Sequence, residues 1–203
     1  MLNKDKKIID LIIKIKRLNM NFIKNVDTNM ILFFGDKIQN TFLNPIMIFF
    51  TEIGNIGLIW IFISFILIIK KKYRKVGITT IMALIINSIL GEGLIKNIIQ
   101  RPRPFTMINN INLLIPAPTS YSFPSGHTSS SFACAIVIAY YLKKLLIPSI
   151  SLAILIAISR LYLQVHYLSD IIGGIILGII SAIISIKLIN FIYNKYIDKR
   201  TTN

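Results

Sequence analysis

Two histidines and one aspartate are the residues best suited to carry chemistry. His127 and His166 are the only histidines of the chain, and Asp170 follows His166 by four residues. In a helix this spacing places both side chains on one face, where the carboxylate can accept the Nδ1 proton of the imidazole. That bond fixes the tautomer and leaves Nε2 of His166 as a nucleophile, while His127 can protonate a leaving group. Two histidines in these separate roles are typical of phosphoryl transfer through a phosphohistidine.

Cationic residues accompany the histidines. Lys96, Arg101 and Arg103 end one apolar run, and Arg160 lies late in another. Ionisable groups at membrane depth are costly, so we take them as functional candidates. We expect their side chains to neutralise the oxygens of a multiply charged anion such as a phosphate.

The tetrapeptide Pro-Ser-Gly-His, residues 124–127, precedes a further apolar run. Gly126 permits close backbone approach, and the start of the following helix presents free N–H groups and a positive dipole end. Ser125 is suited both to cap this helix and to bind an anion. The segment therefore predicts a phosphate cradle.

The amino-acid composition indicates the class of protein that holds these residues in place. The chain has 203 residues with 23 Lys and Arg against 8 Asp and Glu, a formal charge of +15, and 54% of it is hydrophobic. One small core cannot bury that much apolar surface, which excludes a soluble domain, and the same numbers exclude disorder. The charges lie between apolar runs and not on one polar face, which argues against a nucleic-acid binder.

The apolar runs predict an all-α, multi-pass membrane bundle. Five spans are expected, at about residues 53–69, 76–99, 129–142, 147–165 and 171–192. Residues 28–52 are apolar but broken by Asp36 and Pro45, which suits interfacial or re-entrant helices or a sixth crossing. We divide the chain into an amphipathic interfacial segment (1–27), one transmembrane domain (28–195) and a cytoplasmic tail (196–203).

Lysine and arginine in short loops predict the orientation. The 70–75 run, Lys143 and Lys144, and the basic tail fall on one face if spans alternate, so that face is expected to be cytoplasmic. The 100–128 loop and the 166–170 turn then lie on the extracytoplasmic face. Five spans would put the Lys-rich N-terminus there too, so either residues 28–52 cross the membrane or the N-terminal helix lies on the outer surface.

Three spaced motifs resemble those of the type 2 phosphatidic acid phosphatase family, whose fold is shared with vanadium haloperoxidases. The first is Lys96 and Arg103-Pro104, with six residues between them. The second is Pro-Ser-Gly-His at 124–127. The third is Ser159-Arg160, followed after five intervening residues by His166 and after three more by Asp170. The resemblance covers roughly residues 44–190 and implies a transmembrane helical phosphatase domain.

Roles follow from this resemblance residue by residue. His166 resembles the nucleophile, Asp170 its orienting partner and His127 the general acid. Phosphate binding is implied for Lys96, Arg103, Ser125, Gly126 and Arg160. Arg101 has the wrong spacing from Lys96, and we treat it as a secondary contact. Glu92, four residues before Lys96, is expected to form a structural ion pair with it. The resemblance implies no metal and no cofactor.

The substrate is expected to be a lipid phosphate or diphosphate entering from the bilayer. A compact chain of bacterial appearance resembles the undecaprenyl diphosphate phosphatases, which regenerate the cell-wall lipid carrier. Phosphatidylglycerophosphate or phosphatidic acid hydrolysis, a lipid phosphotransferase and a non-enzymatic protein that binds anionic lipid are the alternatives. No nucleic-acid partner is expected, and the sequence leaves the oligomeric state open.

Overall fold

The computed structural model describes residue 18 and residues 20–196. All regular elements of this part of the chain are helical, and it contains no strand. The expected all-α architecture is thus confirmed. Residues 1–17 and 19 of the predicted amphipathic segment, and residues 197–203 of the predicted tail, lie outside the described residues.

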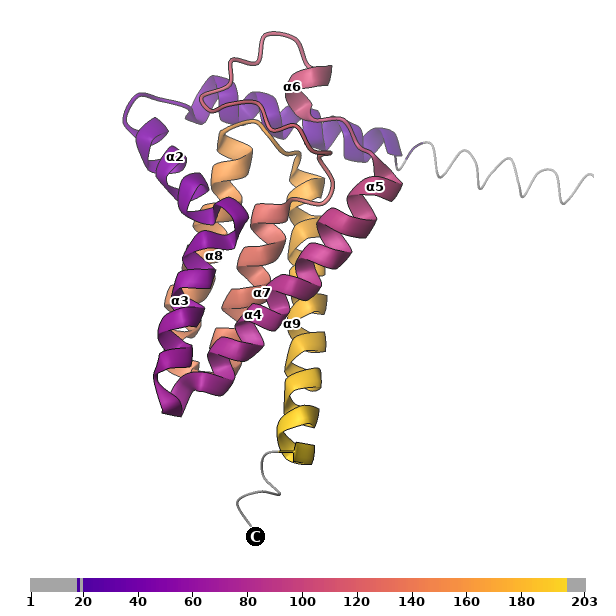
Figure 1. Cartoon of the computed structure of the whole chain (residues 1–203). Coiled ribbons are helices and arrows are strands. Elements are labelled where there is room, and N and C mark those ends of the chain that lie inside the picture. Colours follow the sequence, from indigo (N-terminus) through magenta and orange to yellow (C-terminus); the bar gives the residue numbers. More distant parts are fainter. Residues whose placement is uncertain (1–17, 19, 197–203) are drawn as a thin grey trace, which may run out of the picture.

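Four stretches are long and apolar enough to cross a membrane, and they are Leu43–Ile69, Lys71–Met107, Lys143–Tyr162 and Leu168–Lys195. A shorter helix, α7 (Gly126–Tyr141), runs among them and corresponds to the predicted span 129–142. All five predicted spans therefore have a helical counterpart in the bundle (Figure 1).

The first stretch contains α2 (Leu43–Gly54) and α3 (Leu58–Ile69), joined by a 3-10 turn at Asn55–Gly57. The predicted start of this span, residue 53, lies inside α2, so that prediction was wrong by about three turns of helix. Pro45 falls in the first turn of α2, where the backbone N–H has no helical partner, and it does not break the helix. Just before α2, Asn40 Oδ1 accepts from the N–H of Leu43, the first residue of the helix, at 2.9 Å.

The second stretch begins with a 3-10 turn (Lys71–Tyr73) and α4 (Arg74–Ser88), and a π-helical turn (Ile89–Ile95) leads from α4 into α5 (Lys96–Ile99). The stretch ends with α6 (Pro104–Met107). The last two helices of the bundle are α8 (Leu146–Tyr162) and α9 (Leu168–Tyr196). Figure 1 shows α2 and α5 diverging at the end of the bundle that carries α6.

Helix α7 forms the buried centre of the bundle, and small residues bring its neighbours close. A Cβ added to Gly174 of α9 would lie 2.9 Å from the Ser125 carbonyl oxygen, and one at Gly178 would lie 2.7 Å from that of Ser129. These glycines therefore allow close helix packing. Cys134, also on α7, is fully buried in the core.

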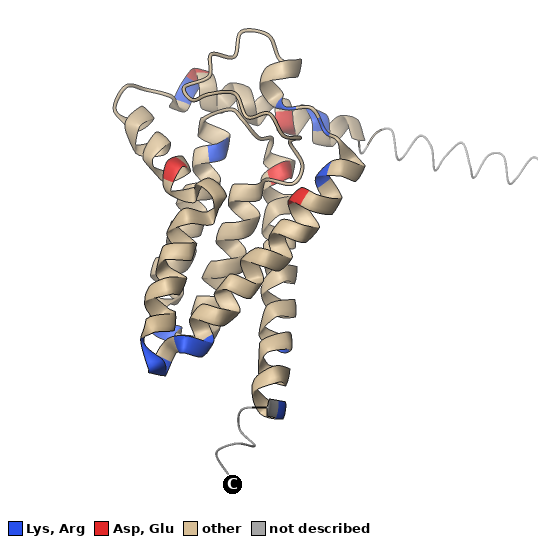
Figure 2. Cartoon of the chain, in the orientation of Figure 1, with Lys and Arg blue, Asp and Glu red and all other residues tan. Residues whose placement is uncertain are grey.

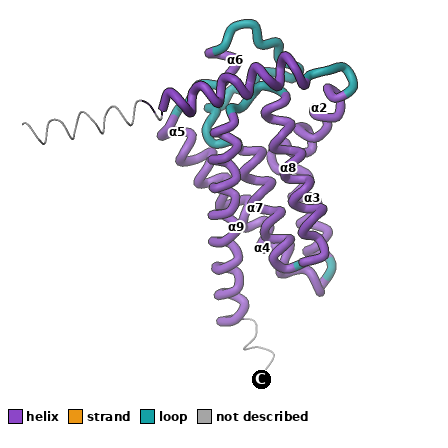
Figure 3. Tube along the Cα trace, turned by 180° about the vertical axis from the view of Figure 1, so that it is seen from behind, coloured by secondary structure: helices purple, strands orange, loops and turns teal. Residues whose placement is uncertain are grey.

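The N-terminal helix (residues 20–33) lies across the end of the bundle that carries α6, as Figures 1 and 3 show from opposite sides. It runs without a break through the predicted boundary between residues 27 and 28. Gln164 holds it there by donating from Nε2 to the Ile31 carbonyl at 2.9 Å. Residues 28–52 thus contribute the end of this helix, which lies at the same end of the bundle as α6, and the start of the kinked span.

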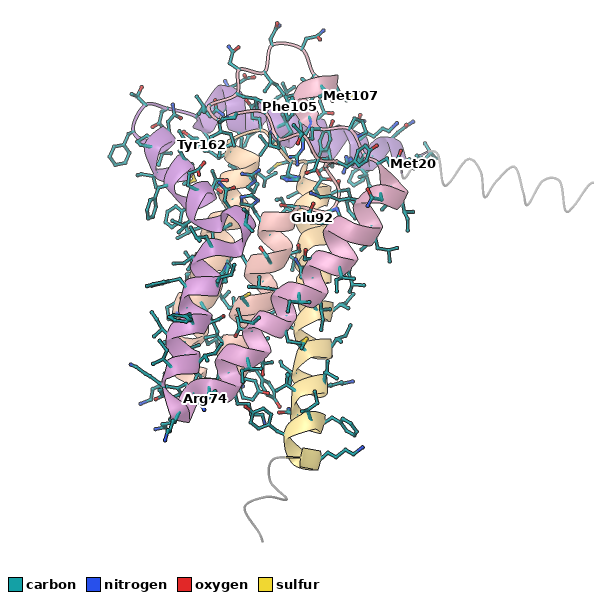
Figure 4. All side chains as sticks on the ribbon, in the orientation of Figure 1. Met20, Arg74, Glu92, Phe105, Met107 and Tyr162 are labelled. Atoms are coloured by element: carbon teal, nitrogen blue, oxygen red, sulfur yellow. The ribbon has the colours of Figure 1, made fainter. Side chains whose placement is uncertain are left out.

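Charge divides the molecule along its long axis. The acidic residues of the described part all lie toward the end with α6, whereas the 70–75 basic run lies at the opposite end (Figure 2). Figure 4 shows the same separation, with Glu92 near the α6 end and Arg74 at the other. The polar loops that carry the candidate residues are gathered at one end of an apolar bundle.

Candidate functional site

A pocket of about 730 Å³ opens at the α6 end of the bundle, between α2, α4, α7 and α8. Six of the predicted site residues line it, and they are Lys96, Arg103, Gly126, His127, Arg160 and His166. The two others, Ser125 and Asp170, are buried beside it and do not reach its wall. The structure therefore brings together residues from the three separate motifs.

Three cationic side chains are buried around the pocket. Lys96 Nζ bonds Ser120 Oγ at 3.1 Å, and Arg103 Nε donates to the Ser120 carbonyl at 2.7 Å. Arg160 donates from Nη1 to Thr51 Oγ1, while its buried Nε has no partner among the described residues. Buried cations require compensating negative charge, so this ring of donors is suited to an anion with several oxygens.

Gly126 and Ser125 hold the start of α7 against the pocket. Ser125 Oγ is the N-cap, accepting from the Thr128 N–H at 3.4 Å and the Thr128 hydroxyl at 2.9 Å. A Cβ on Gly126 would lie 2.5 Å from Glu92 Oε1, so only glycine fits here without displacing that carboxylate. Glu92 also pairs with Lys96 Nζ at 2.7 Å, which confirms the expected ion pair.

His166 lies in the loop between α8 and α9, and it is almost completely buried. Its Nε2 is 3.3 Å from Nη1 of Arg103. A guanidinium can only donate, so Nε2 is the acceptor and the ring proton is on Nδ1. Nδ1 in turn lies 3.4 Å from Asp170 Oδ2, longer than a normal hydrogen bond but close enough for a strong electrostatic interaction.

Burial lowers the pKa of His166 to about 3. The Asp170 carboxylate acts in the opposite direction, and the Arg103 and Arg160 guanidinium groups lower the pKa further. The ring is consequently neutral at neutral pH, and its Nε2 lone pair accepts the bond from Arg103 at the pocket wall. This is the protonation state that a nucleophilic imidazole needs.

Both carboxylate oxygens of Asp170 accept hydrogen bonds. Asp170 is fully buried in the first turn of α9, where Oδ2 accepts from the Ser122 hydroxyl at 2.5 Å and the Tyr167 N–H at 2.9 Å. Its other oxygen, Oδ1, accepts from Arg101 Nη1 at 2.6 Å. These bonds hold the carboxylate in place behind His166.

Arg101 does not line the pocket, and it joins the site to the N-terminal helix. Besides Asp170, it binds Asp27 Oδ2 through Nη2 at 2.7 Å. Asp27 is itself buried and also accepts from the N–H and hydroxyl of Ser169. Sequence reasoning missed Asp27 because its partners lie far away along the chain.

Replacing Asp27 by asparagine is expected to lower stability and leave catalysis nearly intact. The change removes one charge from the Arg101 pair, which corresponds to a loss of roughly 2 kcal/mol. Arg101 keeps its bond to Asp170, so kcat should stay within about threefold of wild type. Thermal unfolding in detergent and phosphate release measure the two effects. A large fall in kcat without loss of stability would contradict this division.

His127 lies in the first turn of α7 and faces α2 across the pocket. Its Nε2 is 2.8 Å from Oδ1 of Asn55, in the turn between α2 and α3. Sequence reasoning missed Asn55, although the Gly-Asn-Ile-Gly interruption of an otherwise apolar run at 54–57 was a usable signal.

Comparisons with known proteins extend the resemblance. A family model described as "PAP2 superfamily" matches residues 72–193. An "Undecaprenyl-diphosphatase" of Sulfolobus acidocaldarius is 35% identical over 72% of this chain and 70% of its own length. "Undecaprenyl-diphosphatase BcrC" of Bacillus subtilis is 32% identical over 70% and 72%. The crystal structure of a transmembrane PAP2 type phosphatidylglycerolphosphate phosphatase from B. subtilis superposes with a TM-score of 0.69 and 25% identity, covering 85% of this chain and 88% of that one.

Proposed function

The chain belongs to the PAP2 superfamily, and from that membership and the geometry of the pocket we propose that it hydrolyses the phosphate of a membrane lipid, with undecaprenyl diphosphate as the substrate. One observation supports this most strongly. His166 lines a pocket surrounded by three buried cations, and its Nε2 lies 3.3 Å from one of them, Arg103.

The chemistry follows from the position of each group. Lys96, Arg103 and Arg160 bind the oxygens of the terminal phosphoryl group and stabilise the charge that develops on them. Nε2 of His166 attacks phosphorus, forming a P–N bond as the bond to the leaving oxygen breaks. His127 gives that oxygen a proton. It then removes a proton from water, whose oxygen attacks phosphorus and breaks the P–N bond, releasing phosphate and free enzyme.

The pocket also offers a route for the lipid chain. Ile56, Ile61 and Ile85 line it and are at the same time exposed on the outside of the bundle, so the pocket reaches the lipid-facing surface. Leu84 adds a further apolar contact to this wall. A lipid can therefore place its headgroup among the cations while its chain stays in the bilayer.

The membrane orientation is part of this proposal. The basic 70–75 run lies at the end opposite the pocket, and such clusters favour the cytoplasmic side. The pocket would then face the extracytoplasmic side. That placement suits an enzyme that acts on a lipid carrier after its outward-facing use.

Phosphatidylglycerophosphate is the second candidate substrate, because the B. subtilis structure is of a phosphatase for that lipid. The same three cations and two histidines would serve either headgroup, so the choice depends on the pocket walls. A phosphotransferase is disfavoured, because the named relatives are hydrolases.

Purified protein assayed in detergent with EDTA tests the proposal. We expect release of inorganic phosphate from undecaprenyl diphosphate at least about tenfold faster than from phosphatidylglycerophosphate or phosphatidic acid, a difference of about 1.4 kcal/mol in transition-state binding. Within the described residues no group of three or more His, Cys, Asp and Glu could hold a metal ion, so EDTA should not reduce the rate. Faster hydrolysis of phosphatidylglycerophosphate would favour the second candidate, and no phosphate release from any lipid would refute hydrolysis.

A further inference from the structure

The turn between α2 and α3 is an irregular piece of backbone inside an apolar span. Ile56 has a φ of 54° and Gly57 a φ of 71°, so two successive residues are left-handed. This conformation is unfavourable for a β-branched residue, and Ile56 is 93% exposed, with no packing to impose it. Irregular backbone at membrane depth is tolerated where it lines a cavity, and all three residues of the turn line the pocket.

The turn directs the side chain of Asn55 to His127. Asn55 Oδ1 lies 2.8 Å from His127 Nε2, and Asn55 Nδ2 lies 2.8 Å from Oε2 of Glu52. A carboxylate can only accept, so the amide end facing Glu52 is the donating Nδ2. The oxygen therefore faces His127, whose Nε2 carries a proton.

The resulting chain of bonds runs from Glu52 through Asn55 to His127. Glu52 precedes Asn55 by three residues, so the carboxylate and the amide are held by the same end of α2. A Cβ on Gly54 would lie 3.1 Å from His127 Cδ2, so the backbone here also packs directly against the imidazole. Two residues of the kinked segment, Gly54 and Asn55, thus contact the ring, and Asn55 is in turn bonded to Glu52.

We propose that Asn55, oriented by Glu52, is a positioning residue that holds the imidazole of His127 in the orientation needed for proton transfer. The kink between α2 and α3 places Asn55 beside that imidazole. This inference rests on the proposed function, because it assigns a task to the general acid of that reaction. A general acid must approach the leaving oxygen in one orientation, and a free ring would sample others.

A comparison of leaving groups tests this directly. The leaving group of an n-alkyl phosphate is an alkoxide, which needs a proton as it leaves. A nitrophenyl phosphate that carries the same alkyl chain on its ring releases a stable nitrophenolate, which does not need that proton. We expect Asn55→Leu to lower kcat/KM for the alkyl substrate by about tenfold or more and for the aryl substrate by at most about twofold. A purely structural role for Asn55 would lower both equally, and that result, or no loss on either substrate, would overturn the proposal.

Asn190→Leu is the matched control. Asn190 is also half-buried and its Oδ1 also accepts one side-chain bond, from the Tyr141 hydroxyl at 2.9 Å, but it lies on α9 outside the pocket lining. It should leave the ratio of the two kcat/KM values unchanged. A shift of that ratio equal to that of Asn55→Leu would count against the proposal.

Two further variants keep the test decisive. The exchange E52Q/N55D retains one carboxylate and one amide in reversed order, and should restore the alkyl-phosphate rate to within about threefold of wild type. Glu52 is exposed, so Glu52→Ala provides the test should Asn55→Leu fail to fold, with a selective loss of about threefold or more expected. If Glu52→Ala left the ratio of the two kcat/KM values unchanged, the proposal that Glu52 orients Asn55 would be overturned. Lack of turnover by the wild-type protein would instead refute the proposed function itself.

Discussion

Replacing His166 by alanine is expected to abolish turnover, with a loss of about 10⁴-fold or more in kcat. The reason is that, in the proposed mechanism, Nε2 of His166 forms the new bond to phosphorus, and this atom lies at the pocket wall beside the Arg103 guanidinium. Water could attack the bound phosphate directly, but it would lack an oriented lone pair. Phosphate release from the lipid substrate in detergent measures the effect.

The loss must be separated from damage to the fold, because His166 is buried. His166→Gln keeps most of the volume and a polar end but is not a nucleophile of this kind, and it should be as inactive as the alanine variant. Both proteins should elute as the wild type does in size-exclusion chromatography. Either variant retaining more than about a tenth of the activity would contradict the assigned role.

Asp170→Asn is the second change with a large expected effect, a fall of about 10³-fold in kcat. An asparagine amide can turn its NH₂ toward His166 Nδ1, which would move the ring proton to Nε2 and block the nucleophile. The change also removes the negative charge beside the imidazole as it becomes cationic in the phosphoryl-transfer step. Rates of phosphate release at saturating lipid report the loss in kcat.

Asp27→Asn is the matched control for Asp170→Asn. Both carboxylates bind Arg101, at 2.7 Å and 2.6 Å, and both are buried. Only Asp170 lies beside His166, so the two variants should lose comparable stability but differ by more than about a hundredfold in kcat. Equal kcat values in the two variants would show that both act only through Arg101.

The parts of the site that could be predicted lie in three short motifs, and within each motif the residues are close together in the sequence. Arg160, His166 and Asp170 fall within one helix end, one loop and one helix start, so their spacing carries information about their geometry. The structure places Arg160 and His166 on the pocket wall and Asp170 directly behind them, as a short segment allows.

The parts that escaped prediction depend on contacts across the bundle. Asn55 meets His127 from 72 residues away, and Asp27 meets Arg101 from 74 residues away. Nothing in the local pattern around Asp27 indicates a buried partner, because a single acidic residue in an amphipathic helix is normally solvated. The start of the first span was missed for a related reason, since Asn44 resembles a break but bonds the Tyr162 hydroxyl at 2.7 Å.

The end of the bundle that carries the candidate site could be predicted from charge more securely than from hydrophobicity. The 70–75 cluster identifies the end of the bundle away from the pocket, and the structure keeps the two ends apart. The side on which the N-terminal helix lies was open, because the residues after it suit either a crossing or a surface helix. Packing of Ile31 and Asp27 against the site end places that helix across it.

Rapid quenching of a reaction with radiolabelled lipid diphosphate is the most direct test of the central claim, that the phosphoryl group passes through His166. The enzyme should acquire an acid-labile, base-stable label that maps to His166 and that forms and decays at least as fast as kcat. The label should be absent from His166→Gln and present with EDTA. Full turnover by wild-type enzyme with no label on His166, or with the label on another residue, would contradict the mechanism.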